Sequence, residues 1–429
     1  MSLTIKVLVG VFLGILLGLF INLSGLNSQD GWINTYIVDG LFFVIGKMFV
    51  NGLKMLVVPL VFFSLICGVC GIGNLSTLGR VGGKSFLLYM MTTAIAIAVA
   101  ISLAVSVGLG EGMEFEEATS FTAKETPPLS EVIINIVPSN PIQAMANGDM
   151  LPLIFFSILV GISMLMLGEK STPFVKGAEI ANEIMMKMVT IVMAIAPYAV
   201  FALIAKSVAE LGLELLIQLA AYVAVLVSAL LIHLLFTLMI VLKLFSGLSP
   251  MIFLRKIRSA QVFAFSTASS NATIPVTLRT VTKRLGVDNA VASFTVPFGA
   301  TINMDGTAIM QGVATVFIAN IYGLELGVMG YLTVILMSVL ASVGTAGVPG
   351  VGLIMLSMVF TQVGLPVEGI GLILGVDRLM DMIRTAVNVS GDAVVSSIVA
   401  KSEGSLDRGV YDDSMAGVEG AESLVIKNV

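Results

Sequence analysis

Charged residues are scarce in this chain of 429 residues. Asp, Glu, Lys and Arg make up only 11% of it, against roughly 25% in an ordinary soluble domain. A soluble chain of this length needs a charged, solvated surface, so soluble enzymes, disordered proteins and collagen-like chains are excluded. The 22 basic residues are outnumbered by 27 acidic ones. No basic face is left for DNA or RNA, and we expect no nucleic-acid partner.

Cysteine and histidine are almost absent. The two cysteines, Cys67 and Cys70, are too few for a disulfide framework. The single histidine, His233, cannot complete a metal site with them. We therefore predict packing roles for the cysteines and a core position for His233, which lies in an apolar run. Because no nucleophile–base pair is evident, we expect neither an enzyme nor a cofactor.

Apolar residues are what the chain has in excess, with 57% hydrophobic residues and a mean hydropathy of +1.04. They gather in runs that reach the length of about 20 residues needed to span a bilayer. Six candidate spans cover 4–26, 37–70, 83–109, 148–168, 182–212 and 215–246. No small-residue cleavage site follows the first, so we expect a first transmembrane helix there rather than a removed signal peptide. The sequence predicts an all-α, multi-pass integral membrane protein.

The breaks between the spans carry an orientation signal. Arg80 and Lys84 follow the second span and more basic residues follow the sixth, whereas 110–131 holds six Glu and one Lys. Because Lys and Arg gather in cytoplasmic loops, we expect the basic loops inside and the acidic loop outside. Both termini are then cytoplasmic in a cell inner (plasma) membrane protein, and 404–429 forms a polar, mobile tail.

Two uncharged segments in the last 180 residues are unlike plain spans. Residues 259–278 read STASSNATIP at their centre, and residues 326–367 read SVGTAGVPGVG. Small hydroxyl residues, Gly and Pro weaken a helix. Irregular backbone at membrane depth survives only inside protein or beside a water-filled cavity. We predict two helical hairpins that enter the membrane and turn back, with two kinked spans as the alternative. Such paired segments point to a transporter binding site.

One carboxylate stands alone in an apolar run. Asp305 is the only charged residue between Asp288 and Glu325, within ATINMDGTAIMQG. A carboxylate at membrane depth is costly and usually faces a partner or an ion path. Asn303, Asp305 and Thr307 offer the oxygen ligands that hard cations such as Na⁺ prefer. The alternative is a buried Asp305 that holds its own helix together through backbone bonds.

The last span carries a polar stripe, in GVDRLMDMIRTAVNVSGDAVVSS. At 100° per residue the polar side chains share a face about 100° wide. They are Asp377, Asp381, Arg384, Thr385, Asn388 and Asp392. Arg384 has the planar fork that matches a carboxylate, and Asp381 can accept hydrogen bonds from an ammonium. The stripe suits a zwitterion that bears an extra acid, and a purely structural polar network is the alternative.

These motifs resemble a known family. ATINMDGTA, SSNATIPVT, GTAGVPGVG and D-x-x-x-D-x-x-R-T-x-x-N-x-x-x-D are similar to the dicarboxylate/amino acid:cation symporters, the glutamate transporter family, over about residues 4–403. The resemblance implies a homotrimer with eight transmembrane helices, two re-entrant hairpins and inverted repeats. It also implies a scaffold and a transport domain that moves as an elevator.

The resemblance divides the chain as follows. The scaffold covers 1–82 and 110–212, the transport domain covers 83–109 and 213–403, and a tail covers 404–429. Within the transport domain lie hairpin 1 (about 249–283), span 7 (about 288–322), hairpin 2 (about 326–363) and span 8 (about 366–401).

The resemblance also implies the site residues. For substrate they are Ser269, Ser270, Thr307, Val348, Gly350, Gly352, Asp381, Arg384, Thr385 and Asn388. For Na⁺ they are Tyr89, Thr92, Thr93, Gly299, Thr301, Asn303, Asp305, Ser342, Val343, Thr345, Asn388 and Asp392. Arg384 matches the family arginine that reads the side-chain carboxylate of the substrate.

The chain departs from the family pattern at one point. Family members that take acidic amino acids usually carry a second arginine near the site. The two positions where it usually stands are Ala268 and Met382 here, and Arg378 lies nearby on the last span. Arg378 either pairs with Asp377 or reaches the place of the usual arginine. Members that take neutral amino acids replace the arginine matching Arg384, and members that take C4-dicarboxylates lack the aspartate matching Asp381.

We therefore expect a secondary active symporter of the lipid bilayer, taking up L-aspartate or L-glutamate with a Na⁺ gradient. A proton-coupled glutamate or C4-dicarboxylate symporter is the near alternative, because a proton can also neutralise Asp305. An ion channel is a weaker one, since it would need a continuous polar pore.

Overall fold

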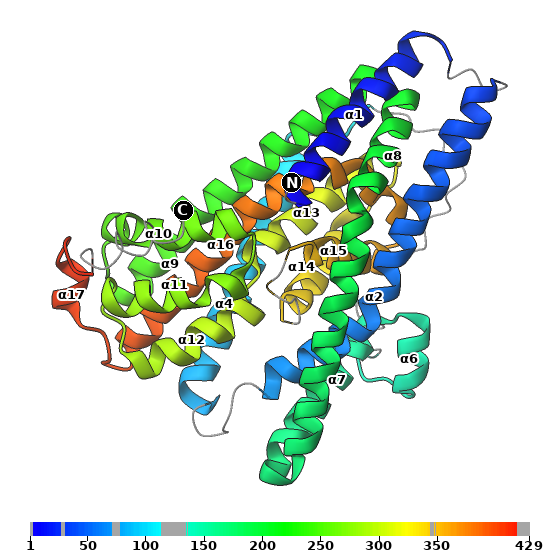
Figure 1. The fold of residues 1–429 in the computed structure, drawn as a ribbon. Coiled ribbons are helices and arrows are strands. Elements are labelled where there is room, and N and C mark those ends of the chain that lie inside the picture. Colours follow the sequence, from blue (N-terminus) through cyan, green and yellow to red (C-terminus); the bar gives the residue numbers. More distant parts are fainter. Residues whose placement is uncertain are drawn as a thin grey trace.

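The computed structural model is almost entirely helical, and it describes residues 3–26, 31–70, 78–112, 134, 136–343, 347 and 349–417 (Figure 1). The elements are α1 (Leu3–Leu23), η1 (Ile33–Phe42), α2 (Phe43–Cys70), η2 (Leu78–Gly82), α4 (Gly83–Ser106), α6 (Pro141–Asn147), α7 (Met150–Leu167), η4 (Gly168–Ser171), α8 (Thr172–Ile232), η5 (His233–Thr237), α9 (Leu238–Ser246), α10 (Pro250–Thr267), α11 (Ser270–Lys283), α12 (Asn289–Ile302), α13 (Asp305–Ile321), α14 (Gly327–Ser342), α15 (Val351–Gln362), η6 (Val367–Gly369), α16 (Ile370–Ser402) and α17 (Arg408–Asp412). Among these residues the single β-bridge joins Val287 to Leu406.

Several helical stretches are long and apolar enough to cross a membrane. By length and composition they are Ile5–Leu23, Ile33–Cys70, Arg80–Ser106 and Pro152–Ser246 among the described residues. Large apolar side chains face outward along them, for example Phe12 and Phe20 on α1, each 61% exposed. An apolar outer face of this extent fits a chain surrounded by lipid.

The 61-residue helix α8 consists of two helices. Gly212 interrupts it with φ 62° and ψ −142°, a conformation that glycine adopts without steric cost. The break lies at the boundary between two of the expected spans, 182–212 and 215–246. The helix that contains the expected span 182–212 begins earlier than this span, at Thr172.

The first bundle is formed by α1, α2 and α7 with the first half of α8 (Figure 1). Gly10, Gly14 and Gly18 recur every four residues on α1 and allow its backbone to approach α8. A Cβ on Gly10 would lie 2.5 Å from the carbonyl oxygen of Pro197, and one on Gly14 would lie 2.8 Å from that of Phe201. Small residues at this spacing are a common means of close helix packing in membranes.

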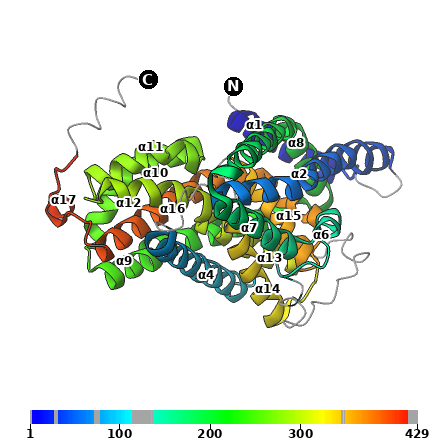
Figure 2. The same ribbon diagram turned by 90° about the horizontal axis from the view of Figure 1, so that it is seen from below.

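The second bundle surrounds α16, which has α10, α12 and α13 packed on it, while α4 packs on α13 (Figures 1 and 2). Every residue of α13 from Asp305 to Ala319 is buried. The expected span 288–322 is broken here, because α12 ends at Ile302 and α13 begins at Asp305. The unwound residues lie within ATINMDGTA, where the sequence indicated a cation site.

Two helix pairs occupy the segments predicted as hairpins. In the first, α10 and α11 meet at Ala268, whose φ of 49° is left-handed, and the Ser269 side chain caps α11. In the second, α14 and α15 flank residues 343–350. Their tips touch, since the Gly347 carbonyl accepts from the Ser269 hydroxyl at 2.7 Å and from the Asn271 backbone N–H at 3.1 Å.

The start of the C-terminal tail is folded, which corrects the expectation of a mobile tail from 404. Tyr411 is fully buried on α17, and its hydroxyl donates to the Ser249 carbonyl at 2.9 Å. The buried Lys256 ammonium donates to the Val410 carbonyl at 2.7 Å. The rest of the tail (418–429) and the acidic loop from 113 to 131 lie outside the described residues.

Candidate functional site

The polar stripe of α16 lies inside the second bundle. All six of its members are buried, because α8, α10, α12 and α13 pack against α16. They are Asp377, Asp381, Arg384, Thr385, Asn388 and Asp392. Buried polar groups at membrane depth need partners or ligands, so the stripe divides into a substrate part and an ion part according to what each group contacts.

Arg384 is the centre of the substrate part and is fully buried. Its Nη2 donates to Oδ1 of Asp381 at 3.0 Å, and its Nη1 lies 2.9 Å from Oδ1 of Asp377, out of line for a hydrogen bond. Among the described residues, its Nε and Nη1 have no hydrogen-bond partner. A buried guanidinium with donors to spare is suited to hold a further carboxylate.

Hairpin 2 lies directly over this arginine. A Cβ on Gly352 would lie 3.5 Å from Nη2 of Arg384 and 3.3 Å from Cγ2 of Thr307. The Gly350 backbone N–H, at φ 87°, donates to Oδ2 of Asp381 at 3.4 Å. The structure therefore brings Gly350, Gly352, Thr307, Asp381 and Arg384 close together.

The remaining substrate candidates lie on α16, at the start of α11 and in hairpin 2. The Thr385 hydroxyl donates to the Asp381 carbonyl at 2.7 Å, and Ser270 is buried at the start of α11 next to Ser269. Arg378 reaches the site, with Nη1 3.7 Å from Oδ2 of Asp381. Val348 lies outside the described residues.

The ion part consists of two clusters. In the first, Asn388 and Asp392 of α16 lie against Asn303, at the break between α12 and α13. The Asn303 amide donates to Oδ1 of Asp392 at 2.9 Å and to the Asn388 carbonyl at 3.1 Å. Oδ1 of Asn303 is buried without a hydrogen-bond partner among the described residues. A Cβ on Gly299 would lie 2.4 Å from Oδ1 of Asp392, so only glycine leaves room for this carboxylate.

In the second cluster, Asp305 lies against hydroxyl groups of α4. The hydroxyls of Thr93 and Thr92 donate to its Oδ1 at 2.5 and 3.4 Å. Tyr89, one turn away, is fully buried, and its hydroxyl donates to the Thr295 carbonyl at 3.0 Å. The cluster supplies carboxylate, hydroxyl and amide oxygens, the ligand types of a hard cation.

Four further sodium candidates belong to a different region. The hydroxyls of Thr301 and Ser342 each donate to a carbonyl of their own helix, at Pro297 and Val339. Val343 is buried at the end of α14, and Thr345 lies outside the described residues. Among the described residues, the hydroxyls of Thr301 and Ser342 thus bond within their own helices, and this sodium site stays a prediction.

Two contacts were not predicted from the sequence. The spacing of the stripe put Asp377 and Arg384 on one face of the helix, but it did not predict that they would lie 2.9 Å apart. His233 is buried as expected, but it is not a simple core residue, because its Nε2 lies 2.9 Å from Oδ2 of Asp305. A lone histidine in an apolar run was the available signal. Cys67 and Cys70 are free thiols, and among the described residues no group of three or more His, Cys, Asp or Glu is arranged to hold a metal ion.

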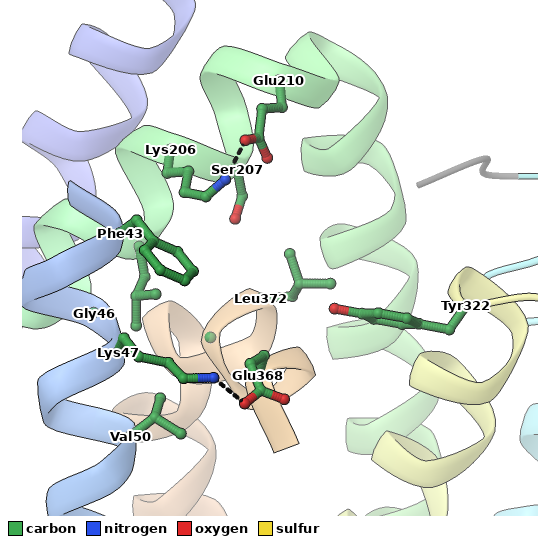
Figure 3. Close-up of a pocket in the computed structure, with 12 residues that line it drawn as sticks. Phe43, Gly46, Lys47, Val50, Lys206, Ser207, Glu210, Tyr322, Glu368 and Leu372 are labelled. Atoms are coloured by element: carbon green, nitrogen blue, oxygen red, sulfur yellow. Dashed lines mark hydrogen bonds and ion pairs between the residues drawn. The ribbon is translucent and has the colours of Figure 1, made fainter. Parts of the chain in front are cut away.

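A separate, partly open pocket with a cavity volume of about 50 Å³ lies between the bundles (Figure 3). It is lined by Phe43, Gly46, Lys47, Val50, Leu203, Lys206, Ser207, Glu210, Tyr322, Glu368, Gly371 and Leu372. Lys47 on α2 pairs with Glu368 of η6 at 2.5 Å, and Lys206 pairs with Glu210 on α8. None of the predicted site residues lines it, so it is distinct from the polar stripe of α16.

Residues 3–402 match the family model described as the sodium:dicarboxylate symporter family. The chain belongs to that family. As a sodium:dicarboxylate symporter family member it is a membrane transporter, not an enzyme, and the match confirms the resemblance carried by the sequence motifs.

Curated members of this family align with nearly the whole chain. A proton/glutamate-aspartate symporter of Escherichia coli is 35% identical over 419 residues, 95% of this chain and 94% of its own. A proton/sodium-glutamate symport protein of Geobacillus stearothermophilus is 34% identical over 403 residues, 92% of this chain and 94% of its own. A C4-dicarboxylate transport protein of Bacillus subtilis is 30% identical over 432 residues, 99% of both chains. The chain is therefore similar to secondary symporters of acidic solutes.

Proposed function

We propose that this symporter takes up L-aspartate or L-glutamate together with Na⁺. The observation that carries the proposal is the buried Arg384, whose Nε has no hydrogen-bond partner among the described residues. An unpaired buried cation donor is costly, and a substrate carboxylate here would satisfy it. Asp381, a buried carboxylate beside Arg384, would accept hydrogen bonds from the substrate ammonium.

The amino group is what favours an amino acid over a plain C4-dicarboxylate. A dicarboxylate would bring two negative charges next to Asp377 and Asp381, with Arg384 and Arg378 as the nearby cations. An acidic amino acid carries an ammonium as well, which offsets the second carboxylate. The charges around the site therefore support aspartate or glutamate as the substrate class.

Sodium coupling is supported by the oxygen clusters around Asp305 and Asp392. Both carboxylates are buried, and the hydroxyl and amide groups that the structure places against them are neutral. A bare carboxylate crosses a membrane at high cost, and a bound cation lowers that cost. We assign Na⁺ to Tyr89, Thr92, Thr93, Asn303 and Asp305, and to Gly299, Asn303, Asn388 and Asp392.

The two bundles support an elevator-type movement. We propose that α1, α2, α7 and the first half of α8 form the scaffold and that the bundle around α16 carries the solutes. Hairpin 2 would close over the substrate, with its tip held by the contact of Gly347 with Ser269. Ion binding that orders this hairpin would favour substrate binding, which is positive coupling. The protein would act as a homotrimer with eight spans, two re-entrant hairpins and cytoplasmic termini.

Uptake into proteoliposomes tests the substrate class. With an inward Na⁺ gradient, labelled aspartate or glutamate should accumulate, succinate should accumulate less, and serine should not accumulate. Asp305→Asn should flatten the dependence of uptake on Na⁺, with Asp288→Asn, an exposed residue at the start of α12, as the matched control. Uptake of succinate without aspartate would contradict the proposed substrate. A parental Na⁺ dependence in Asp305→Asn would remove Asp305 from the ion site.

A further inference from the structure

His233 occupies a break in helical geometry at the end of a long helix. Helix α8 ends at Ile232, a π-helical turn covers His233–Thr237, and α9 continues from Leu238. Single π turns inside α-helices are rare and frequently occur at functional sites. This turn lies against α4 and α16, the helices that carry the candidate ion ligands.

The imidazole of His233 contacts one of the two carboxylate oxygens of Asp305. Its Nε2 lies 2.9 Å from Oδ2, whereas the hydroxyls of Thr93 and Thr92 both donate to Oδ1. His233 is 1% exposed and Asp305 is fully buried. One oxygen of the carboxylate thus contacts the histidine, and the other accepts hydrogen bonds from two hydroxyls of α4.

The surroundings of the ring assign its proton. A carboxylate oxygen accepts, so Nε2 carries the hydrogen of this bond. Nδ1 is buried without a hydrogen-bond partner among the described residues. The geometry therefore corresponds to an Nε2–H group that donates to Oδ2 of Asp305.

We propose that His233 is a positioning residue of the coupling-ion site, an inference that rests on the proposed sodium coupling. An N–H donor on Oδ2 points its hydrogen at that oxygen and offers no lone pair to a cation. The hydroxyls of Thr92 and Thr93 can instead rotate and present their oxygens as ligands. His233 thereby fixes the rotamer of Asp305 and directs Na⁺ to Oδ1, on the side of α4.

Three substitutions separate this role from simple packing. His233→Gln keeps an amide N–H at nearly the position of Nε2. His233→Asn carries the same amide on a shorter chain, which does not reach Oδ2, and His233→Leu fills the space without a donor. Uptake of aspartate is measured against Na⁺ concentration, and substrate binding is measured separately at saturating Na⁺. Monodisperse elution and thermal unfolding of each purified variant show whether it is folded.

A hydrogen bond to a charged group is worth about a tenfold to hundredfold change in an equilibrium constant. We expect half-saturation by Na⁺ to rise about tenfold or more in His233→Asn and His233→Leu, and by less than about threefold in His233→Gln. Substrate affinity at saturating Na⁺ should change less than about twofold in all three. In an Asp305→Asn background, His233→Leu should have no further effect on the Na⁺ dependence.

The outcomes separate the two claims. A parent protein whose uptake ignores Na⁺ overturns the proposed sodium coupling, and this role with it. A Na⁺-dependent parent with an unchanged, folded His233→Leu overturns the role of His233 alone. Equal losses in folded His233→Gln and His233→Leu also overturn it, because a packing role does not distinguish a donor at Nε2 from its absence.

Discussion

Substitution of Arg384 is the sharpest test of the substrate site. Its guanidinium is fully buried, lies 2.9 Å from Asp377 and 3.0 Å from Asp381, and has Nε without a hydrogen-bond partner among the described residues. Arg384→Ala removes a cation between two buried carboxylates. Breaking such a pair costs about 3 to 5 kcal/mol, so we expect a large fall in the unfolding temperature as well as loss of uptake.

Arg384→Lys separates recognition from stability. The ammonium keeps the positive charge near Asp377 and Asp381 but loses the planar fork. Loss of one charge-assisted hydrogen bond to the substrate carboxylate costs about 1.5 to 3 kcal/mol, which weakens binding about tenfold to hundredfold. Unfolding temperature should fall less than in Arg384→Ala.

Binding of aspartate by the purified protein, measured by calorimetry at saturating Na⁺, checks this prediction. Arg279→Lys, a basic residue on α11 that takes no part in the proposed site, serves as the control and should bind aspartate like the parent. Parental affinity in a folded Arg384→Lys variant would refute the assignment of Arg384 to the substrate carboxylate.

Other predictions follow from single contacts. Asp381→Ser should reduce uptake of aspartate more than uptake of succinate, and equal losses would argue against its ammonium role. Gly347→Ala places a Cβ 2.9 Å from the Ala300 carbonyl oxygen, so we expect slower uptake and weaker aspartate binding, both checked with the purified variant. Lys84, hydrogen-bonded at 2.6 Å, holds the pKa of Glu403 below its ordinary value of 4.5. A lowered carboxyl pKa stabilises the fold above the unfolded pKa, so thermal stability should fall below about pH 4.5, less so in Glu403→Gln.

Much of the fold could be predicted from the sequence because lipid imposes simple rules. Apolar runs of sufficient length marked the helices now described as α1, α2, α4, α7 and α8. The Ser-rich and Gly/Pro-rich centres marked the two helix pairs, since Gly, Pro and small hydroxyl residues weaken helices locally. The stripe of α16 followed from the 100° step of a helix, which needs no knowledge of neighbouring segments.

Contacts between segments distant in the sequence could not be predicted in this way. The pairing of Asp305 with His233, 72 residues apart, depends on how α9, α4 and α13 pack. The contact of Asp377 with Arg384 depends on side-chain rotamers, which helical periodicity does not determine. The docking of Tyr411 near Ser249 depends on a tail whose polar composition resembled that of a mobile segment.

The coupling ion is tested most directly by uptake under one gradient at a time. Proteoliposomes with equal pH on both sides and Na⁺ only outside should accumulate labelled aspartate above its external concentration. The same vesicles with an inward proton gradient, and no Na⁺ on either side, should not. Accumulation driven by the proton gradient alone, with no response to Na⁺, would contradict the assignment of Na⁺ to the clusters around Asp305 and Asp392.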